Sequence, residues 1–235
     1  MIRMHVTLVI MLAVLLGGCA STLQARNVQP SGFLGDYRPL LQDKDSEEGA
    51  LKVYRNPAVD WRAYRKILLE PVTVWGGFSS TLCKEQQEDL QRLADSFCDA
   101  LSRKLSMDYD LVEKPTPGVM RIRVAITHAE KSWVAPAFLS KVSLELQTVN
   151  TLWRFASGKP AFAGEMTIEF TVHDAQTGEL LLAGADRRVG GQALFDKHLF
   201  NSWGDVKNSL VFWTDLSAYR LCQLRQETTC VQPKA

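Results

Sequence analysis

The N-terminus constrains this chain most, because it determines which residues remain to fold and in which compartment. Met1–His5 carries a fixed positive charge, an apolar run follows from 6 to 16, and two glycines and Cys19 end it. A charged start, a short apolar stretch and small residues before a cleavage point are the parts of a bacterial export signal. A membrane-spanning helix needs about 20 apolar residues, more than this run supplies. We therefore predict that residues 1–18 are a signal peptide that is removed.

The end of this signal, Leu16-Gly17-Gly18-Cys19, resembles the lipobox of bacterial lipoproteins. In such proteins the cysteine sulfur receives a diacylglycerol, the chain is cut before the cysteine, and the new amine is acylated. Several acyl chains make a stable anchor, since each buried methylene contributes about 0.8 kcal/mol. By the sorting rule of these lipoproteins, Ala20 after the cysteine implies the outer membrane. The resemblance thus implies a membrane protein lipidated on Cys19, with its domain in the periplasm.

Charge excludes one class of partner. The chain has 27 basic and 26 acidic residues, and Arg3 is the only Lys or Arg that leaves with residues 1–18. Proteins that bind nucleic acid carry an excess of positive charge, which this balance lacks. We predict no nucleic-acid partner.

The cysteines other than Cys19 suggest a disulfide, because an exported protein meets an oxidising compartment. They are Cys83, Cys98, Cys222 and Cys230. A helix that starts at residue 84 and runs through Cys98 places Cys83 about 22 Å from it, whereas disulfide Cα atoms lie within about 7 Å. Cross-pairing with the C-terminal cysteines remains, as does Cys222–Cys230 alone. We expect the pair Cys222–Cys230.

Two stretches have helical periodicity. In residues 84–107 the apolar residues recur every three or four positions, at Leu90, Leu93, Ala94, Phe97, Leu101 and Leu105. This spacing predicts an amphipathic helix. A similar spacing predicts a closing helix from Asp205 to about Arg225.

Strands are predicted where apolar and polar residues alternate. They cover residues 64–75, 109–112, 120–126, 165–174 and 180–188. On the polar face we expect Arg121 and Arg123 to be opposed by Glu165 and Glu169. For residues 132–160 both periods fit, and we favour a helix or an apolar flap.

These elements predict an α+β domain over residues 60–228. Helices on one face of a mostly antiparallel sheet are the simplest architecture for their order. The lipidated Cys19 and a polar tether occupy residues 19–59, and a tail follows at 229–235. Within the tether, residues 32–37 are more apolar than a spacer needs and could dock back onto the domain.

Four blocks carry a family resemblance: GFLGDY at 32–37, WRAYRKILLEPV at 61–72, SGKPAFAGE at 157–165 and DAQTGE at 174–179. In this order they resemble the bacterial lipoproteins catalogued as domain of unknown function 3313. The resemblance implies an envelope lipoprotein. It brings no established reaction and no catalytic residues.

The histidines give little indication of a catalytic or metal site. No Cys/His set has zinc-ligand spacing, and neither His-Glu-x-x-His nor Gly-x-Ser-x-Gly occurs. His173 and Asp174 are neighbours in a strand and so point to opposite faces. We predict that His173 is a solvated strand residue, and that the protein has no catalytic residues, no metal and no cofactor.

Aromatic residues are more suggestive. The segments 133–155 and 195–213 hold more aromatic residues than two short loops need for their own packing: Trp133, Phe138, Trp153, Phe155, Phe195, Phe200, Trp203, Phe212 and Trp213. If exposed, they would form a contact surface for a protein or an acyl chain, with core packing as the other explanation. We predict a non-enzymatic outer-membrane lipoprotein that binds another envelope component. The alternatives are an accessory lipoprotein of an envelope transport or assembly complex, and a hydrolase that uses His173 or His198.

Overall fold

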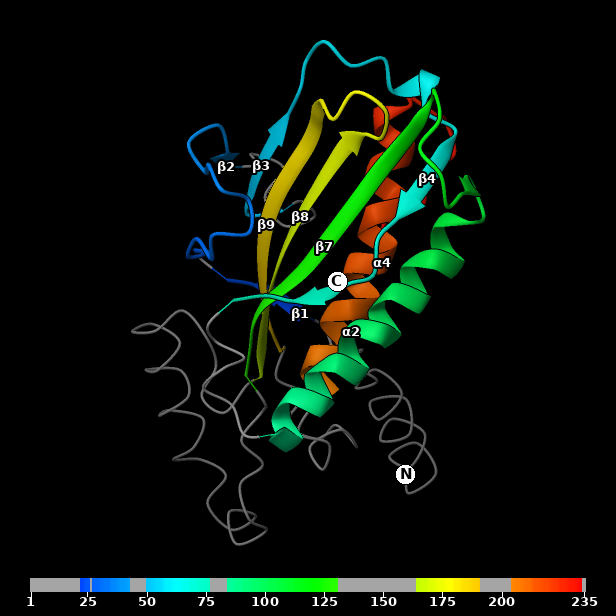
Figure 1. Cartoon of the computed structure of the whole chain (residues 1–235). Coiled ribbons are helices and arrows are strands. Elements are labelled where there is room, and N and C mark those ends of the chain that lie inside the picture. The colour runs from blue at the N-terminus through cyan, green and yellow to red at the C-terminus, as the bar shows by residue number, and fades with distance from the viewer. Residues whose placement is uncertain are drawn as a thin grey trace, which may run out of the picture.

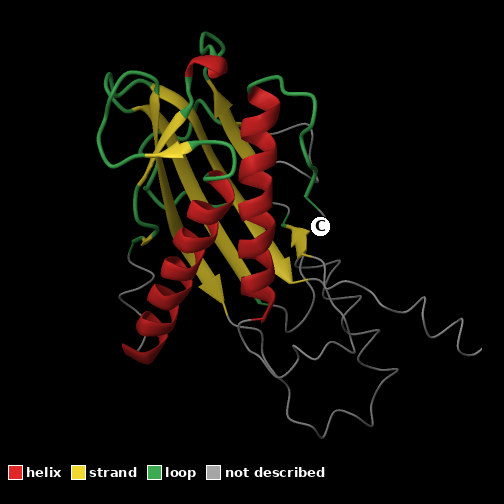
Figure 2. Cartoon of the chain, turned by 90° about the vertical axis from the view of Figure 1, so that its right-hand side faces the viewer, coloured by secondary structure: helices red, strands yellow, loops and turns green. Residues whose placement is uncertain are grey.

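The domain has two layers, with two helices on one face of a sheet. A computed structural model describes residues 22–25, 27–42, 50–76, 84–130, 164–190 and 204–233. Figure 1 shows the sheet and the helices beside it, and Figure 2 shows both helices lying across the same face. The predicted α+β class is confirmed.

The helices are α2 (Lys84–Leu105) and α4 (Gly204–Leu224), and a short 3-10 helix, η1, covers Trp61–Ala63. The strands are β1 (Thr22–Gln24), β2 (Leu41–Gln42), β3 (Lys52–Arg55), β4 (Lys66–Leu69), β5 (Thr73–Val74), β6 (Asp110–Leu111), β7 (Val119–Glu130), β8 (Glu165–Asp174) and β9 (Leu180–Gly190). Among the described residues, no helix is both long enough and apolar enough to cross a membrane.

The sheet is mixed, so the prediction of a mostly antiparallel sheet is wrong. Its order is β2-β3-β9-β8-β7-β4-β6, with β1 also on β9 and β5 also on β7. Strands β7, β8 and β9 are antiparallel neighbours, whereas β4 and β5 run parallel to β7, and β6 runs parallel to β4. The cause is α2, which carries the chain from β5 back along the sheet before β7 begins. Strands joined by such a crossover helix run parallel.

The core lies between the helices and the sheet. The six apolar residues that predict α2 are all buried, at 5% exposure or less. From α4, the ring of Trp213 lies 6.4 Å from that of Phe97 on α2, where the two helices meet. Both rings belong to one buried cluster with the helix-facing residues of β7 and β8. Each fully buried Leu or Phe side chain contributes roughly 1.5–3 kcal/mol, which fixes the helices on this face.

The opposite face of the sheet is covered in part by the N-terminal segment. The Tyr37 hydroxyl donates to Glu169 Oε2 at 2.5 Å, and the Ser31 N–H donates to Glu169 Oε1 at 3.1 Å. Glu169 lies on β8 and is fully buried. The turn between these donors needs Gly32 and Gly35 at φ of 93° and 72°, where glycine is favoured.

The pairing of N-terminal strands with β9 changes the predicted boundary between tether and domain. Strands β1 and β3 both pair with β9, so the described residues before residue 60 belong to the domain and not to a tether. The segment 32–37 does dock onto the sheet. Its polar neighbours resembled a spacer because their partners, such as Glu169, are buried polar groups far away in the sequence.

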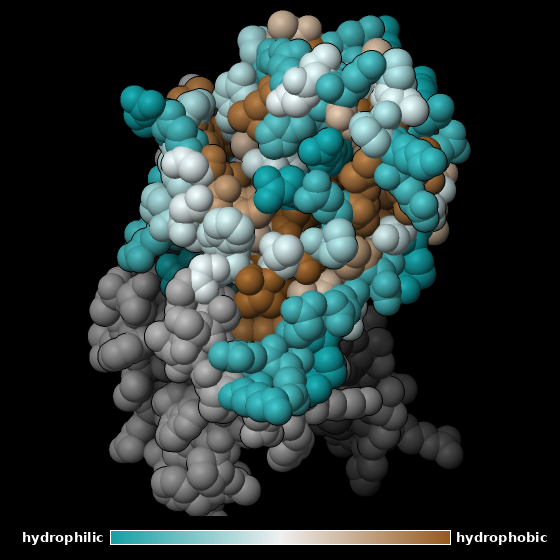
Figure 3. Space-filling model, in the orientation of Figure 1, coloured by the Kyte–Doolittle hydropathy of each residue, from teal (hydrophilic) through white to brown (hydrophobic). Residues whose placement is uncertain are grey.

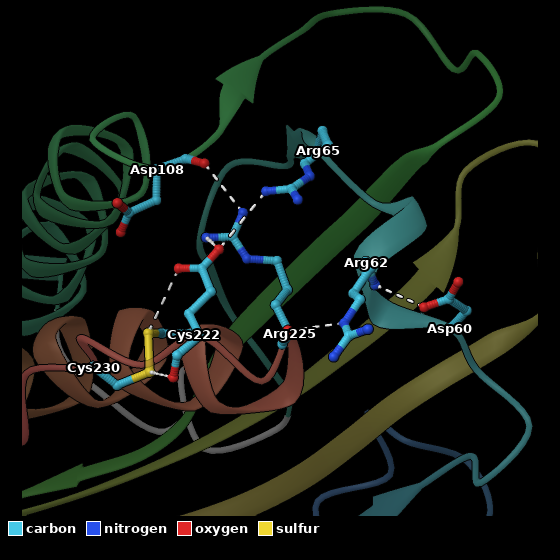
Figure 4. A network of polar contacts seen from close by, with 8 residues as sticks. Asp60, Arg62, Arg65, Asp108, Cys222, Arg225 and Cys230 are labelled. Carbon is cyan, nitrogen blue, oxygen red and sulfur yellow. Dashed lines mark hydrogen bonds and ion pairs between the residues drawn. A yellow bond between two sulfur atoms is a disulfide. The ribbon is translucent and has the colours of Figure 1, made fainter.

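The C-terminal end of α4 is fastened by a disulfide and an arginine network, drawn in Figure 4. Cys222 and Cys230 are joined, as the sequence predicts. Between them, Arg225 pairs with Glu227 at 2.8 Å and donates to the Asp108 carbonyl at 3.3 Å. Its guanidinium also lies 4.2 Å from the ring centroid of Tyr109. These contacts bind the end of α4 to the turn that follows α2.

Candidate functional site

A pocket of about 200 Å³ lies between the two helices and the sheet. Its apolar lining residues are Ala50 before β3, Val53 on β3, Phe97, Leu101 and Leu105 on α2, Ile122 and Val124 on β7, Ile168, Phe170 and Val172 on β8, Leu182 on β9, and Trp213, Leu216, Leu221 and Leu224 on α4. For scale, an engineered apolar cavity of roughly 150 Å³ binds benzene. The pocket is therefore large enough to hold a small apolar group.

The lining residues of the pocket follow the side-chain periodicity of strands and helices. On β8 the lining residues are two positions apart, because alternate side chains of a strand share a face. On α2 they are four positions apart, which places them on one face of a helix. On β9, Gly184 leaves room for the ring of Phe170, since a Cβ there would lie 2.5 Å from Phe170 Cζ. The floor of the pocket thus depends on a glycine opposite an aromatic ring.

One wall contains a buried polar cluster around Asp186, which is 1% exposed. Its Oδ2 accepts hydrogen bonds from Trp213 Nε1 at 2.7 Å and Arg188 Nε at 3.1 Å. Its Oδ1 accepts from Gln24 Nε2 at 3.0 Å and from the Leu51 N–H at 3.2 Å. Both oxygens of this carboxylate are used within the fold. Asp186 therefore positions the pocket wall by fixing the Trp213 indole.

The positively charged residue of this cluster, Arg188, is buried as deeply as Asp186. Arg188 is 1% exposed, and its guanidinium lies 3.8 Å from the ring centroid of Phe212 on α4. A cation above an aromatic face is stabilised by the ring quadrupole, by about 2 kcal/mol when it is desolvated. The sequence signal for this cluster is a pair of opposite charges at positions 186 and 188, which alternation places on one face of the strand.

Polar residues mark the mouth of the pocket. Arg55 on β3 and Gln223 on α4 line the pocket and are exposed, whereas Phe97 and Leu101 are buried. Arg220, half-buried on α4, also lines it and donates from Nη1 to Gln223 Oε1 at 3.0 Å. Arg55 and Arg220 thus line the pocket from β3 and from α4.

Outside the pocket, the exposed large apolar residues of the described surface are scattered. In the view of Figure 3 hydrophilic surface predominates, with apolar surface in separate patches. The exposed large apolar residues are Leu41, Trp75, Met107, Leu111, Val211 and Val231. They come from different parts of the fold, and single exposed apolar residues are normal in soluble domains.

A second cluster consists of His128, Glu130 and Glu165, whose ligand atoms lie within 4.8 Å of one another. Arg187 Nη2 already donates to both Glu165 oxygens, at 2.6 and 2.8 Å. His128 Nε2 is 3.3 Å from the same carboxylate. A guanidinium at this point competes with a metal ion for Glu165, so the cluster fits an ion-pair network better than a metal centre.

The arginines of β7 find a different partner from the predicted one. Arg121 and Arg123 lie 3.8 and 3.2 Å from Glu70, while Glu165 and Glu169 bind Arg187 and Tyr37. The prediction is wrong because β4 lies beside β7, which brings Glu70 to these arginines.

Perturbed pKa values occur at three ring side chains. His173 is half-buried, and burial, followed by the charges of Arg123 and Arg121, lowers its pKa below 6.5. This residue is thus less solvated than the sequence predicts. Burial also raises the pKa of Tyr64 and of Tyr109 to about 12, so both phenols stay protonated at neutral pH.

Several predicted site residues lie outside the described residues. They are Cys19, the aromatic set Trp133, Phe138, Trp153 and Phe155, and His198. The segment 132–160, predicted as a helix or flap, lies outside them as well. Of the predicted sites, the structure describes the Cys222–Cys230 disulfide.

Comparison with known proteins gives one family and a distant likeness. No curated protein matches the chain. The solved structures that resemble it include two dodecamers of PelC from Paraburkholderia phytofirmans, and each likeness covers 75% of this chain and 96% of that chain. The first, a single-residue variant of PelC, has a TM-score of 0.36 and is 10% identical to this chain. The second has a TM-score of 0.34 and is 8% identical. A likeness at this level supports no argument about function.

The family that matches this chain is the one that the four sequence blocks resemble. Residues 29–217 match the family described as "Protein of unknown function (DUF3313)". Because that match spans most of the sequence, the chain belongs to this family.

Proposed function

We propose that this chain is a non-enzymatic binding protein of the bacterial envelope, anchored in the outer membrane by lipid on Cys19, whose domain takes up an apolar ligand. The observation that carries the proposal is the pocket of about 200 Å³ between the helices and the sheet. Ligand sites are concave and mostly apolar, with a few polar groups that orient the ligand. The pocket has this composition.

The buried polar groups also favour binding over catalysis. Asp186 accepts four hydrogen bonds from the fold, from Trp213, Arg188, Gln24 and Leu51. A general base or a nucleophile needs a lone pair that is directed at a substrate. In the described part of the pocket, both oxygens of this carboxylate already accept the hydrogen bonds that position the wall.

Binding can be tested with a neutral apolar dye, N-phenylnaphthylamine, whose fluorescence rises when it leaves water. Ser217 and Ala50 line the pocket from α4 and from the residues before β3. We expect Ser217→Phe and Ala50→Phe to fill the space and to abolish saturable dye binding. The matched control is Val211→Phe, because Val211 lies on α4 but is 63% exposed and outside the lining.

Near-UV circular dichroism checks that each variant keeps its tertiary structure. Dye binding that is equal in all four proteins would contradict a ligand site in this pocket.

The anchor is tested separately. We expect mass spectrometry of the N-terminal peptide of the mature protein to find acylated Cys19, and Cys19→Ser to release the chain from the membrane fraction. An unmodified Cys19 in the membrane-bound protein would contradict lipid anchoring.

A further inference from the structure

One row of residues on the helix-facing side of the sheet has a glycine where its neighbours carry apolar side chains. In the register of three neighbouring strands (Figure 1), Gly184 on β9 lies between Val53 on β3 and Phe170 on β8. We infer that Gly184 and Phe170 set the size of the apolar group that the pocket admits, because the glycine gives the ring of Phe170 a place against the sheet. This inference rests on the proposed function, since it concerns the ligand of the same pocket.

The exposure of the lining residues places the opening of the pocket between β3 and α4. The lining residues of α2 are Phe97, Leu101 and Leu105, each 2% exposed or less. In contrast, Val53 on β3 and Leu224 on the last turn of α4 are only partly buried. The side towards α2 is therefore closed, and a ligand enters at the side where Gly184 and its neighbours lie.

Phe170 differs from the other lining residues of its strand. Ile168 and Val172, two positions away on either side, are 5% and 3% exposed, whereas Phe170 is only partly buried. All three side chains face the helices, because alternate residues of a strand share a face. Since Phe170 lines the pocket, an occupant contacts this ring.

The absence of a side chain at residue 184 keeps that ring against the sheet. A Cβ there would lie 2.5 Å from Phe170 Cζ and 2.7 Å from Phe170 Cε1, inside van der Waals contact. It would also lie 3.0 Å from the carbonyl oxygen of Lys52 on β3, so residue 184 cannot relieve the clash by tilting towards β3. The ring is the end of a flexible side chain and is the group that moves, and the unfilled space beside it is the pocket.

The ring is large compared with the space that it borders. An apolar cavity of roughly 150 Å³ holds one benzene molecule, and the pocket measures about 200 Å³. A phenyl ring that moves into the pocket therefore fills most of it. Removal of the ring adds a space of similar size.

A series of n-alkanols measures the capacity of the pocket. Each alkanol from hexanol to dodecanol competes with N-phenylnaphthylamine for the full chain carrying Cys19→Ser, which needs no detergent. Each methylene that becomes buried raises the affinity by about fourfold. The affinity therefore rises with chain length until the pocket is full, and the chain length at which the rise ends is the capacity.

We expect Gly184→Ala to lower the capacity, because the ring of Phe170 then occupies part of the pocket. The longest alkanol that fits the unsubstituted protein should lose at least about fourfold in affinity. Phe170→Ala should raise the capacity, because longer alkanols take the place of the ring. The matched control is Phe33→Ala, which removes an equal ring from a partly buried residue that contacts Trp75 outside the lining, and it should leave the capacity unchanged.

The double variant Gly184→Ala with Phe170→Ala separates this mechanism from general damage to the sheet. Without the ring, the added methyl group has no side chain to push into the pocket, so the capacity should return at least to that of the unsubstituted protein. A double variant that binds as poorly as Gly184→Ala alone would overturn the inference. If Gly184→Ala does not fold, Phe170→Ala and its control test the inference by themselves.

Failure of this inference can be told apart from failure of the proposed function. An equal capacity in the unsubstituted protein, Gly184→Ala and Phe170→Ala would overturn the role of this pair and leave the proposed function standing. If neither the dye nor any alkanol binds to the unsubstituted protein, the proposed function fails as well.

Discussion

At the scale of single residues, buried charge is what distinguishes this domain from a simple two-layer fold. Asp186 and Arg188 are each 1% exposed and lie 3.1 Å apart. Burying two charges is costly, and it is offset only when the geometry satisfies their remaining hydrogen bonds. Trp213, Gln24 and Leu51 supply those bonds to Asp186.

We therefore expect Asp186→Asn to lower the free energy of unfolding by about 3–5 kcal/mol, because it removes the negative charge that pairs with the buried guanidinium of Arg188. Urea unfolding followed by circular dichroism measures the change. The control is Asp36→Asn, which breaks the exposed pair with Arg38 and should cause no measurable change. An Asp186→Asn protein as stable as the unsubstituted one would show that the pair is not needed.

His173 gives the domain a pH dependence. Its pKa is lowered in the fold, chiefly by burial and then by Arg123 and Arg121, with Glu70 opposing. Below pH 6.5 the unfolded chain therefore binds a proton that the folded chain resists, so stability falls as the pH drops. We expect the free energy of unfolding to be lower at pH 5.5 than at pH 7.5.

The variant His173→Gln cannot take up that proton, so its stability should change less over the same interval. Asp174 does not complicate this comparison, because its pKa is lowered from 3.8 and it stays ionised at both pH values. If the variant and the unsubstituted protein lose stability equally, the pH dependence belongs to another group.

At the scale of elements, periodicity in the sequence predicted α2, α4, β7, β8 and β9, because each buries one regular face. It did not predict the parallel pairing of β4 with β7, which depends on where α2 returns the chain. It also missed β1 and β3, which are short and whose described residues are only partly buried or exposed. The pocket was not predicted either, since its lining residues come from six elements and no single stretch contains its pattern.

The disulfide between Cys222 and Cys230 fastens the end of α4, which forms one wall of the pocket. Closing a loop with a sequence separation of 8 restricts the unfolded chain, which corresponds to about 2–3 kcal/mol. We expect Cys222→Ser together with Cys230→Ser to lower the free energy of unfolding by that amount. Reducing agent should cause the same loss in the unsubstituted protein.

The double variant serves as its own control, since reducing agent should not destabilise it further. The thiol of Cys98 is free already and adds nothing to this effect. An unfolding midpoint that reducing agent leaves unchanged in the unsubstituted protein would show that the bridge does not stabilise the fold.

At the scale of the whole molecule, the described parts of the sheet and of the two helices enclose an apolar pocket, which Arg55 and Arg220 also line. The N-terminal segment reaches the pocket wall through Gln24, which donates to Asp186. The predicted lipid anchor would lie a few residues before Gln24 in the chain. The domain would thus be held close to the membrane, a source of amphiphilic ligands.

The most direct test of a ligand site is native mass spectrometry after incubation with a detergent-free lipid extract of the bacterial envelope. The full chain carrying Cys19→Ser is compared with the same chain carrying Ser217→Phe as well. We predict an added mass of a few hundred daltons, released on collisional activation, in the first protein and not in the second. Spectra that show only the polypeptide mass in both proteins would contradict the account.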